Sequence, residues 1–496
     1  MNSVPGQRLP ISREVDAMAA ETKLFGKLKT TEQEHEDPKE QLMFDPRPRE
    51  ELNRMVMEMM TTTTRKFWLW AIGLGAGVVV LLFGAWGYMI STGMWVTGLR
   101  RPIYWGVFIV TFVFWIGISH AGTFVSAILR VFKSEFRRPF TRAAELMTTF
   151  GLAAGALYPL IHLGRVWVFY FMVPYPNARW LWPNFRSPLV WDLLAITTYL
   201  LSSTIYLYLP LVPDLAMARD RTTGIRHTAY KILALGWRGT EAEWFRLKKA
   251  IQIFAFAIIP VMFSVHTIVS WDFAVSQVAG WHSTIFGPYF IIGAILSGVS
   301  AVVTILYVLR SSLKHMDYFL RPEHFDALGK LILVFSMSWA YFFFNDYLLG
   351  WYGGEAAVRQ ILTVHATGPA AWVWYTMLIC NIVIPWLTLW NRKIRRTPWL
   401  MFIITLLINV GMYLERYTII PLTLGHQRTP FDWGVYTPQP IEISIVLGTF
   451  CLFTFLYLIM SRLIPLVPVW EVQEGQVAHS LRKVGKAEVP SVTELD

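Results

Sequence analysis

Residues 67–90 read FWLWAIGLGAGVVVLLFGAWGYMI, an uninterrupted run of apolar and small side chains with no charged residue. A hydrocarbon core of about 30 Å is crossed by roughly 20 helical residues, so this run is long enough to span a bilayer. Lipid offers no hydrogen-bond partners to backbone groups, and a spanning segment must therefore be helical. The stretch indicates an integral membrane protein whose fold depends on how many such runs follow.

Nine further runs follow, at 102–128, 143–172, 188–213, 251–270, 287–309, 329–350, 369–391, 398–421 and 441–464. The composition agrees, because 54% of the 496 residues are hydrophobic and only 16% are charged. The sequence predicts an all-α polytopic membrane protein with about ten transmembrane helices. We expect spans two to five (about 102–270) and six to nine (about 287–421) to form two four-helix bundles in the same orientation. The first and last spans would then be two peripheral helices.

Polar tails, 1–66 and 465–496, flank this transmembrane domain of residues 67–464. No apolar signal-peptide region precedes Phe67, so we expect the chain to insert through its first span. The segment 49–60 has a helical pattern with a Met-rich side, which is typical of a helix that lies on the membrane or on a neighbouring subunit. Within the spans, the pairs Gly73/Gly77 and Gly151/Gly155 have the spacing that allows close helix approach in lipid.

Loop charges predict the orientation of the chain. Lys and Arg are frequent in the loops 129–142, 214–250, 310–328 and 392–397, whereas the alternate loops contain only Arg100, Arg101, Arg179, Arg186, Arg359 and Arg428. The positive-inside rule then places both termini in the cytoplasm. The formal net charge of +11 follows from this topology and from contact with anionic lipids, so we infer no nucleic-acid partner.

Ionisable groups inside the spans cost free energy and need a reason. Tyr158, His162 and Arg165 share one helical face (i, i+4, i+7) just after the helix-bending Pro159, and Asp192 enters the next span at a similar depth near the outer side. A histidine and a carboxylate that face each other can exchange protons. Three plainer readings stay open: a core histidine, a snorkelling Arg165, or a simple ion pair between Arg165 and Asp192.

A polar stripe continues inward from this site. It contains Tyr199, Ser203, Tyr206 and Asp214 on the fourth span, and His120 and Glu145 lie in the inner half of the second and third spans. These six residues predict either a proton path or ordinary hydrogen bonds between helices.

We assign a further polar set to the second bundle: His266, Asp272, Asn345, Asp346, Glu415 and Arg416. Its members are either interface pairs or functional groups. Glu415 and Arg416 point about 100° apart on a helix, so we expect their partners on other helices.

Redox centres are not expected on this chain. Its two cysteines, Cys380 and Cys451, lie in separate spans and no CxxCH is present, so an iron–sulfur cluster or covalent haem would belong to a partner, and we predict no metal site. A di-haem cytochrome b would need histidine pairs at matched depth, yet His120 is expected deep and His162 and His266 shallow. A secondary transporter would favour inverted repeats, against which the equal orientation of the two halves argues.

The runs ISHAGTFVSAILR (118–130) and EFRRPFTRAAELMT (135–148) resemble the NrfD/polysulfide-reductase membrane subunit family. Within it, the ten spans, the long N-terminal tail, YPLIHLGR (158–165) and VWD (190–192) are most similar to the larger quinol-oxidising membrane subunit of alternative complex III. The resemblance covers about residues 50–470.

This resemblance implies a multi-pass subunit of the bacterial inner membrane that oxidises a lipoquinol, with menaquinol as the expected substrate, near the outer face. Electrons would pass to a periplasmic iron–sulfur subunit and then to c-type cytochromes, with a paralogous membrane subunit beside it and proton translocation as a further expectation. The implied quinol residues are His162 and Asp192, with Tyr158 and Arg165 as neighbours. Alternatives within the family are a quinone-coupled anchor of a molybdopterin polysulfide or nitrite reductase, and the paralogous structural subunit.

Overall fold

A computed structural model describes residues 43–173, 188–477, 481–484 and 487–490. Within these ranges ten helices are long and apolar enough to cross a membrane, which confirms the predicted fold class. Helix by helix, the spans are α4 to α5 (Arg65–Gly77, Val78–Gly84, Ala85–Thr92), α6 to α7 (Val107–Thr123, Phe124–Ile128, Leu129–Val131), α8 (Thr141–His162), α9 (Pro188–Asp220), α11 (Glu241–Ala274), α12 (Phe286–Ser312), α14 (Pro322–Tyr352), α16 to α17 (Ala371–Leu378, Ile379–Val383, Ile384–Thr388), α19 with η7 (Pro398–Tyr417, Thr418–Leu422) and α20 (Pro440–Leu463).

Shorter elements connect and flank the spans. They are α3 (Arg49–Thr61), η2 (Met94–Val96), η4 (Glu135–Arg137), η5 (Val166–Met172), α10 (Gly224–Leu233), α13 (Met316–Phe319), α15 (Ala356–Thr367), α18 (Arg392–Arg395), η8 (Pro430–Asp432), α21 (Val469–Val477) and an antiparallel pair of short strands, β1 (Leu481–Val484) and β2 (Ala487–Pro490).

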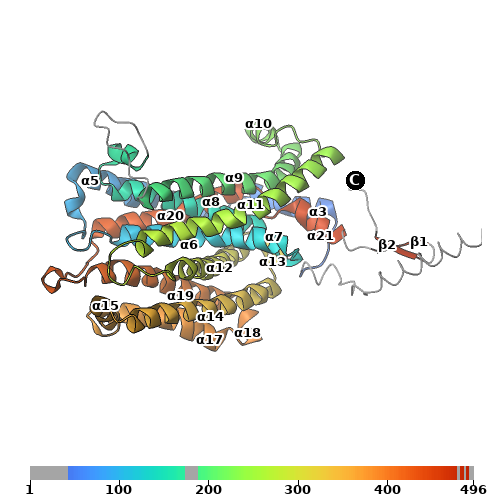
Figure 1. Ribbon diagram of the computed structural model, residues 1–496. Helices are drawn as coiled ribbons and strands as arrows, with labels where there is room; N and C mark the ends of the chain where they lie inside the picture. The colour runs from blue at the N-terminus through green and yellow to red at the C-terminus, as the bar shows by residue number, and fades with distance from the viewer. Residues whose placement is uncertain (1–42, 174–187, 478–480, 485–486, 491–496) are drawn as a thin grey trace, which may run out of the picture.

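The spans pack as two groups of four. Helix α6 packs against α8, α9 packs against α8 and α11, and in the second group α12 packs against α14 and α19, which also contacts α16. Helix α12 joins the groups because it also packs on α6 and α11. The first and last spans lie against each other, and α20 covers α8 and α6 (Figure 1). Interior side chains of the first bundle are therefore enclosed on all sides by helices.

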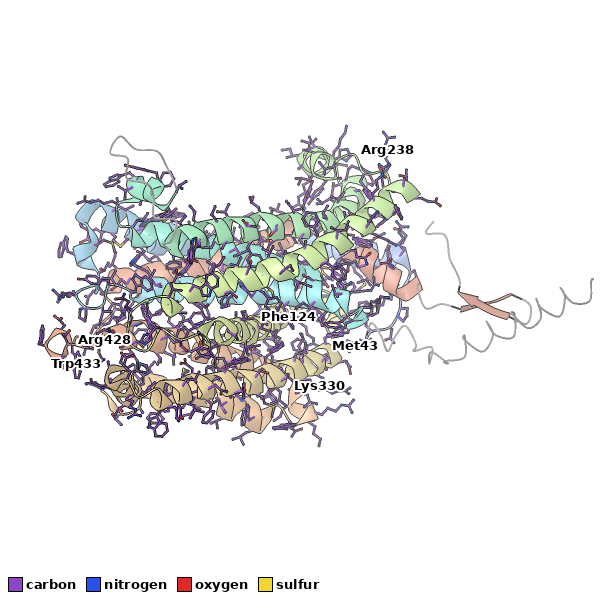
Figure 2. All side chains as sticks on the ribbon, viewed as in Figure 1. Met43, Phe124, Arg238, Lys330, Arg428 and Trp433 are labelled. Carbon is purple, nitrogen blue, oxygen red and sulfur yellow. The ribbon has the colours of Figure 1, made fainter. Side chains whose placement is uncertain are left out.

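The two ends of the bundle differ. The terminal end carries α3 and α21, which contact each other, together with α10 and α13, whereas α5 and α15 mark the opposite end (Figure 1). Figure 2 shows Met43 and Arg238 towards the terminal end, and Arg428 and Trp433 at the opposite end.

Helix α3 packs on its own chain. Its Leu52, Met55, Val56 and Met59 are all buried, and the Arg462 guanidinium donates to the Met59 carbonyl. The Met-rich side predicted to lie on the membrane or on a neighbouring subunit is therefore covered by the terminal end of the bundle itself.

The third span is shorter than predicted. Helix α8 ends at His162, and Gly164 follows with φ +67°, a left-handed conformation that glycine adopts without strain and that ends helices. The residues after it form the 3₁₀ helix η5. Arg165 consequently does not continue the face of Tyr158 and His162, and the expected i, i+4, i+7 arrangement is wrong at its last member.

Candidate functional site

Asp192 and Asp272 meet at the opposite end of the first bundle. Asp192 lies in the first turns of α9 and Asp272 in the last turn of α11, and these helices pack side by side. The Asp192 side chain is 6% exposed, and its carboxyl group lies next to that of Asp272, with one oxygen of each buried and without a hydrogen-bond partner among the described residues. Two neighbouring buried carboxylates repel each other, so this setting favours a proton on one of the two.

His162 is the last residue of α8, at the same end of the molecule. Its ring is half-buried, and its Nδ1 atom lies out of contact with solvent and without a hydrogen-bond partner among the described residues. Arg165 is exposed, and of the ion pairs within the described ranges none joins it to Asp192. The neighbour of Asp192 is thus Asp272, so the alternative of a simple ion pair with Arg165 is not found, and a contact between His162 and Asp192 stays a prediction.

Tyr158 points to another helix. Its hydroxyl lies 2.9 Å from Thr449 Oγ1 on α20, and the Trp115 indole donates to the same oxygen at 3.2 Å. The tyrosine is fully buried in this contact, which ties α8 to α6 and α20. These hydrogen bonds give Tyr158 a part in helix packing, and its place beside a quinol stays a prediction.

His120 and His266 form a pair inside the first bundle. Their ring centroids are 4.5 Å apart, and the Tyr199 ring lies 5.1 Å from that of His120. The predicted depths, His120 deep and His266 shallow, are therefore wrong, as is the placement of His266 and Asp272 in the second bundle, because both are on α11. The reason is helix length: α11 runs on to Ala274, which leaves His266 about two turns from its end.

Both ring nitrogens of His120 contact backbone carbonyls. Nδ1 lies 2.6 Å from the Ile116 oxygen and Nε2 lies 2.9 Å from the Met262 oxygen. A neutral imidazole donates only one hydrogen bond, whereas an imidazolium donates two, so this setting accommodates an added proton. These two contacts also leave neither nitrogen of His120 free to bind a haem iron in this arrangement.

The polar stripe of α9 faces the interior as predicted. The Tyr199 hydroxyl donates to Thr123 Oγ1 at 2.8 Å and has Ser203 beside it. Further along the helix, Tyr206 lies near Glu145, whose two carboxyl oxygens are buried and have no hydrogen-bond partner among the described residues. The stripe therefore leads from the histidine pair towards the terminal end.

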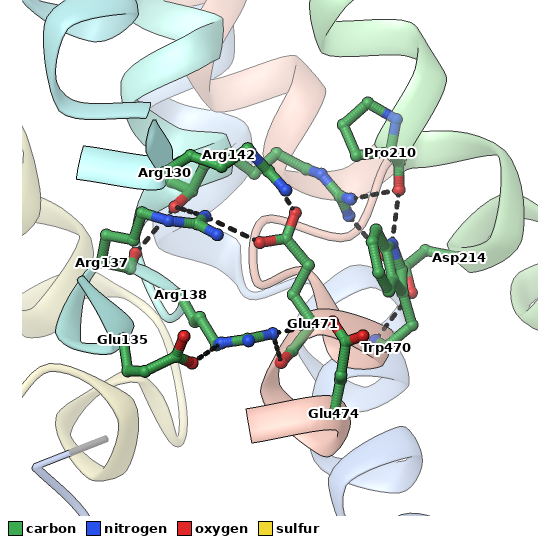
Figure 3. A network of polar contacts seen from close by, with 11 residues as sticks. Arg130, Glu135, Arg137, Arg138, Arg142, Pro210, Asp214, Trp470, Glu471 and Glu474 are labelled. Carbon is green, nitrogen blue, oxygen red and sulfur yellow. Dashed lines mark hydrogen bonds and ion pairs between the residues drawn. The ribbon is translucent and has the colours of Figure 1, made fainter. Parts of the chain in front are cut away.

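An arginine cluster closes the terminal end of the first bundle (Figure 3). Glu471 of α21 is 1% exposed and pairs with Arg130 at 2.7 Å and Arg137 at 2.8 Å, while Arg138 donates to its backbone oxygen at 2.6 Å. Burial raises the pKa of Glu471, but the three arginines outweigh burial and hold its pKa well below the usual range.

Asp214 belongs to the same region. It pairs with Arg142 at 2.6 Å, and both side chains are almost fully buried. Of the six residues predicted for a proton path, Asp214 is therefore held in an ion pair, whereas the other five line the bundle interior.

In the second bundle, Glu415 and Arg416 pair with each other, which the sequence did not predict, while the expected partner on another helix is present for Glu415. Glu415 also accepts a hydrogen bond of 2.8 Å from the Trp339 indole on α14. Asp346 lies on α14 next to Asn345, whose amide donates to its own helix at Tyr341.

The family model for polysulphide reductase, NrfD, matches residues 95–424. This chain belongs to the NrfD family. The matched range includes both bundles and every candidate site residue, and it excludes the first and last spans and both tails.

Three relatives of this NrfD chain are each similar over most of both proteins. A protein of Halobacterium salinarum named as a membrane subunit of dimethyl sulfoxide reductase is 24% identical over 80% of this chain and 91% of its own length. A selenate reductase subunit of Mesobacillus selenatarsenatis is 24% identical over 78% and 90%. The Hdr-like menaquinol oxidoreductase integral membrane subunit of Archaeoglobus fulgidus is 23% identical over 80% and 93%. NrfD chains of this group are thus membrane subunits of oxidoreductase complexes.

Proposed function

We propose that this chain is the quinol-oxidising membrane subunit of a multi-subunit oxidoreductase of the alternative complex III type, with its site formed by His162, Asp192 and Asp272. The observation that carries the proposal is the buried pair of neighbouring carboxyl groups, which can share one proton and take up a second, together with the unpaired Nδ1 of His162 at the same end of the molecule. The relative named as a menaquinol oxidoreductase subunit supports a quinol, and we take menaquinol as the substrate.

The chemistry needs two proton acceptors. Oxidation of a quinol to a quinone releases two electrons and two protons, and proton transfer from each hydroxyl needs a base within hydrogen-bond reach. His162 takes one proton through its free Nδ1, and the carboxyl pair takes the other, so that each carboxyl group then carries one. Both groups return their protons to the outer side, and the electrons leave to a partner protein.

The assembly and its orientation follow from the same proposal. The electron acceptor would be a periplasmic iron–sulfur protein linked to c-type cytochromes, with a paralogous NrfD-like subunit in the membrane. The arginine-rich terminal end would face the cytoplasm of a bacterial inner membrane, with both termini inside, which the positive-inside rule supports.

A second candidate is a quinone-coupled anchor of a molybdopterin reductase, because two of the relatives are named as subunits of dimethyl sulfoxide and selenate reductases. The two candidates predict different partner subunits in the complex. Purification of the tagged complex in mild detergent, with mass spectrometry of its subunits, separates them: multihaem cytochromes support the first, and a molybdopterin protein without c-type haem supports the second.

The site itself is tested with Asp192→Asn and Asp272→Asn in the purified complex. Loss of one proton acceptor should lower the rate of quinol-dependent reduction by about 10² or more. The matched control is Asp220→Asn, on the same helix as Asp192 but exposed at the terminal end, which should keep the normal rate. Normal turnover in both site variants, with intact assembly, would remove the proposed site.

A further inference from the structure

Two adjoining cavities lie in the second bundle near the opposite end, and none of the residues proposed for quinol lines either of them. The outer cavity has a volume of about 190 Å³ and is lined by His282, Ser283 and Glu355 among others. The inner cavity has a volume of about 30 Å³ and is lined by Tyr347, His365 and Glu415 among others. Three residues line both: Gly280, Asp346 and Leu362. Asp346 therefore stands at the connection between them.

The outer cavity opens among charged groups. Glu355 pairs with Arg428 at 2.8 Å and with His282 at 3.1 Å, and all three side chains are more than a third exposed. Arg428 is the main reason that the pKa of Glu355 lies below its usual value, so this carboxylate keeps its charge at the mouth. A charged, hydrated mouth indicates access from water and not from lipid.

The inner cavity is lined by groups that can hold or pass a proton. His365 is 6% exposed and lies between the Tyr347 hydroxyl, at 3.1 Å from Nδ1, and Thr423 Oγ1, at 3.3 Å from Nε2. Hydroxyls can donate or accept, so they suit either protonation state of the ring. Glu415 is 2% exposed and forms part of the same wall.

The volumes limit what the cavities can hold. A water molecule needs roughly 10–15 Å³ of such volume, whereas small-molecule sites measure roughly 300–1,000 Å³. The inner cavity at about 30 Å³ thus admits water but no quinone ring. Four residues after the lining residue Met377, Asn381 is fully buried and neither atom of its amide has a hydrogen-bond partner among the described residues, so a water molecule there would satisfy it.

Arg416 extends from the floor of this cavity to the first bundle. It pairs with Glu415, is 2% exposed, and lies so close to Gly293 of α12 that a Cβ atom there would sit 3.3 Å from its Nη2. A Cβ atom at Gly117 of α6 would sit 3.7 Å from the same nitrogen, so the Arg416 guanidinium lies between the two bundles.

We propose that these cavities form a water-filled proton entry from the outer side into the second bundle, in which Asp346 exchanges protons with the outside and passes them to His365 and Glu415. None of the residues proposed for quinol lines this entry, and only its assignment to the outer side rests on the orientation given with the proposed function. Titratable or charged groups face Asp346 from every neighbouring element: Tyr289 on α12, Tyr347 on its own helix, His282 before α12, Glu355 and His365 at α15, and Glu415 on α19.

Cysteine accessibility tests the water path. In a background with Cys380→Ala and Cys451→Ala, right-side-out vesicles carrying Asp346→Cys or Leu349→Cys are treated with a membrane-impermeant cationic methanethiosulfonate. Leu349 lines the outer cavity, so both thiols should react from the outer side. Phe344→Cys, on the same helix and 62% exposed away from the cavities, is the control that should not react. If neither cavity thiol reacts, or both react only from the inner side, the proposal is overturned.

Infrared difference spectroscopy of the intact protein tests proton exchange without any cysteine variant. Spectra of vesicles are recorded at acid and at alkaline outer pH with the same sodium concentration, so that only the proton concentration differs. Their difference should show the carbonyl band of a buried carboxyl group that becomes protonated as the outer pH falls. Asp346→Asn should lack that band, and Asn345→Asp should retain it. A spectrum identical in the wild type and Asp346→Asn would mean a hydrated pocket that exchanges no proton, which would also overturn the proposal.

Discussion

At the scale of single residues, Asp192 and Asp272 act as one unit. Two carboxyl groups that share a proton have a joint affinity for the next one, which belongs to the pair and to neither residue alone. Removal of either carboxyl group therefore abolishes this joint affinity for a proton.

This predicts non-additive kinetics. Asp192→Asn and Asp272→Asn should each lower kcat/KM for quinol strongly, and the double variant should be hardly slower than either single one, because the shared function is already lost. A double-mutant cycle on the purified complex measures this. If the two losses multiply, the residues act independently and the paired mechanism is wrong.

Glu471 gives a prediction for stability. Glu471→Gln leaves Arg130 and Arg137 buried without their carboxylate, which should cost about 3–5 kcal/mol. Thermal unfolding in detergent measures the loss, and Glu474→Gln, which removes a carboxylate that is 34% exposed, should cost less than about 1 kcal/mol. Equal effects would contradict the role given to burial.

The lowered pKa of Glu471 also determines the pH range in which its ion pairs stabilise the folded protein. A depressed carboxyl pKa contributes stability that is complete above the unfolded value of about 4.3 and is lost only as the pH falls through the folded value. The contribution of this ion-pair cluster should therefore be constant from about pH 5 upward. Unfolding temperatures of the wild type and Glu471→Gln over this range should differ by a constant amount, and a difference that shrinks near neutral pH would contradict this.

At the scale of helices, close approach depends on a glycine that the spacing rule did not select. A Cβ atom at Gly122 of α6 would lie 2.0 Å from the Ala144 backbone oxygen of α8, whereas a Cβ atom at Gly73 would meet nothing within 4 Å. Gly151 and Gly155 do face α6, so that pair of the prediction is confirmed, and of the pair on the first span only Gly77 is in close contact.

Alanine at these two positions should have opposite effects. Gly122→Ala must push α6 and α8 apart, and overpacking of this kind costs typically about 1–3 kcal/mol. Gly73→Ala should be neutral or slightly stabilising, because alanine favours the helix. The unfolding temperatures of the two variants, compared with that of the wild type, test this prediction. An unchanged unfolding temperature for Gly122→Ala would show that α6 and α8 are less tightly packed than described.

Helix α3 should detach when its apolar side is made charged. Met59 is 4% exposed, so Met59→Glu buries a carboxylate without a partner, whereas Thr61→Glu at the exposed end of the helix does not. Limited trypsin digestion should cleave at Arg54 in the first variant and not in the second. Equal protection of both would mean that α3 is not held by these contacts.

At the scale of the whole molecule, the sequence predicted the spans and their grouping well, because lipid imposes length and polarity on each helix separately. It failed where a position depends on a helix end: Gly164 stops α8 before Arg165, and the extension of α11 to Ala274 moves His266 beside His120. The Asp192–Asp272 contact joins residues 80 positions apart, and no helical spacing relates them. Both carboxylates were noticed as intramembrane acids, but their pairing needed the fold.

The arginine cluster around Glu471 also has a consequence for biosynthesis. A chain is made from its N-terminus, and at about 5–20 residues per second roughly 15–65 s separate the appearance of Arg142 from that of Glu471. During that interval Arg130 and Arg137 lack the carboxylate that later neutralises them, so their charge is available to hold this loop on its own side of the membrane while the later helices insert. The same two residues thus serve first to retain the loop and afterwards as part of a buried ion-pair cluster that secures the finished chain.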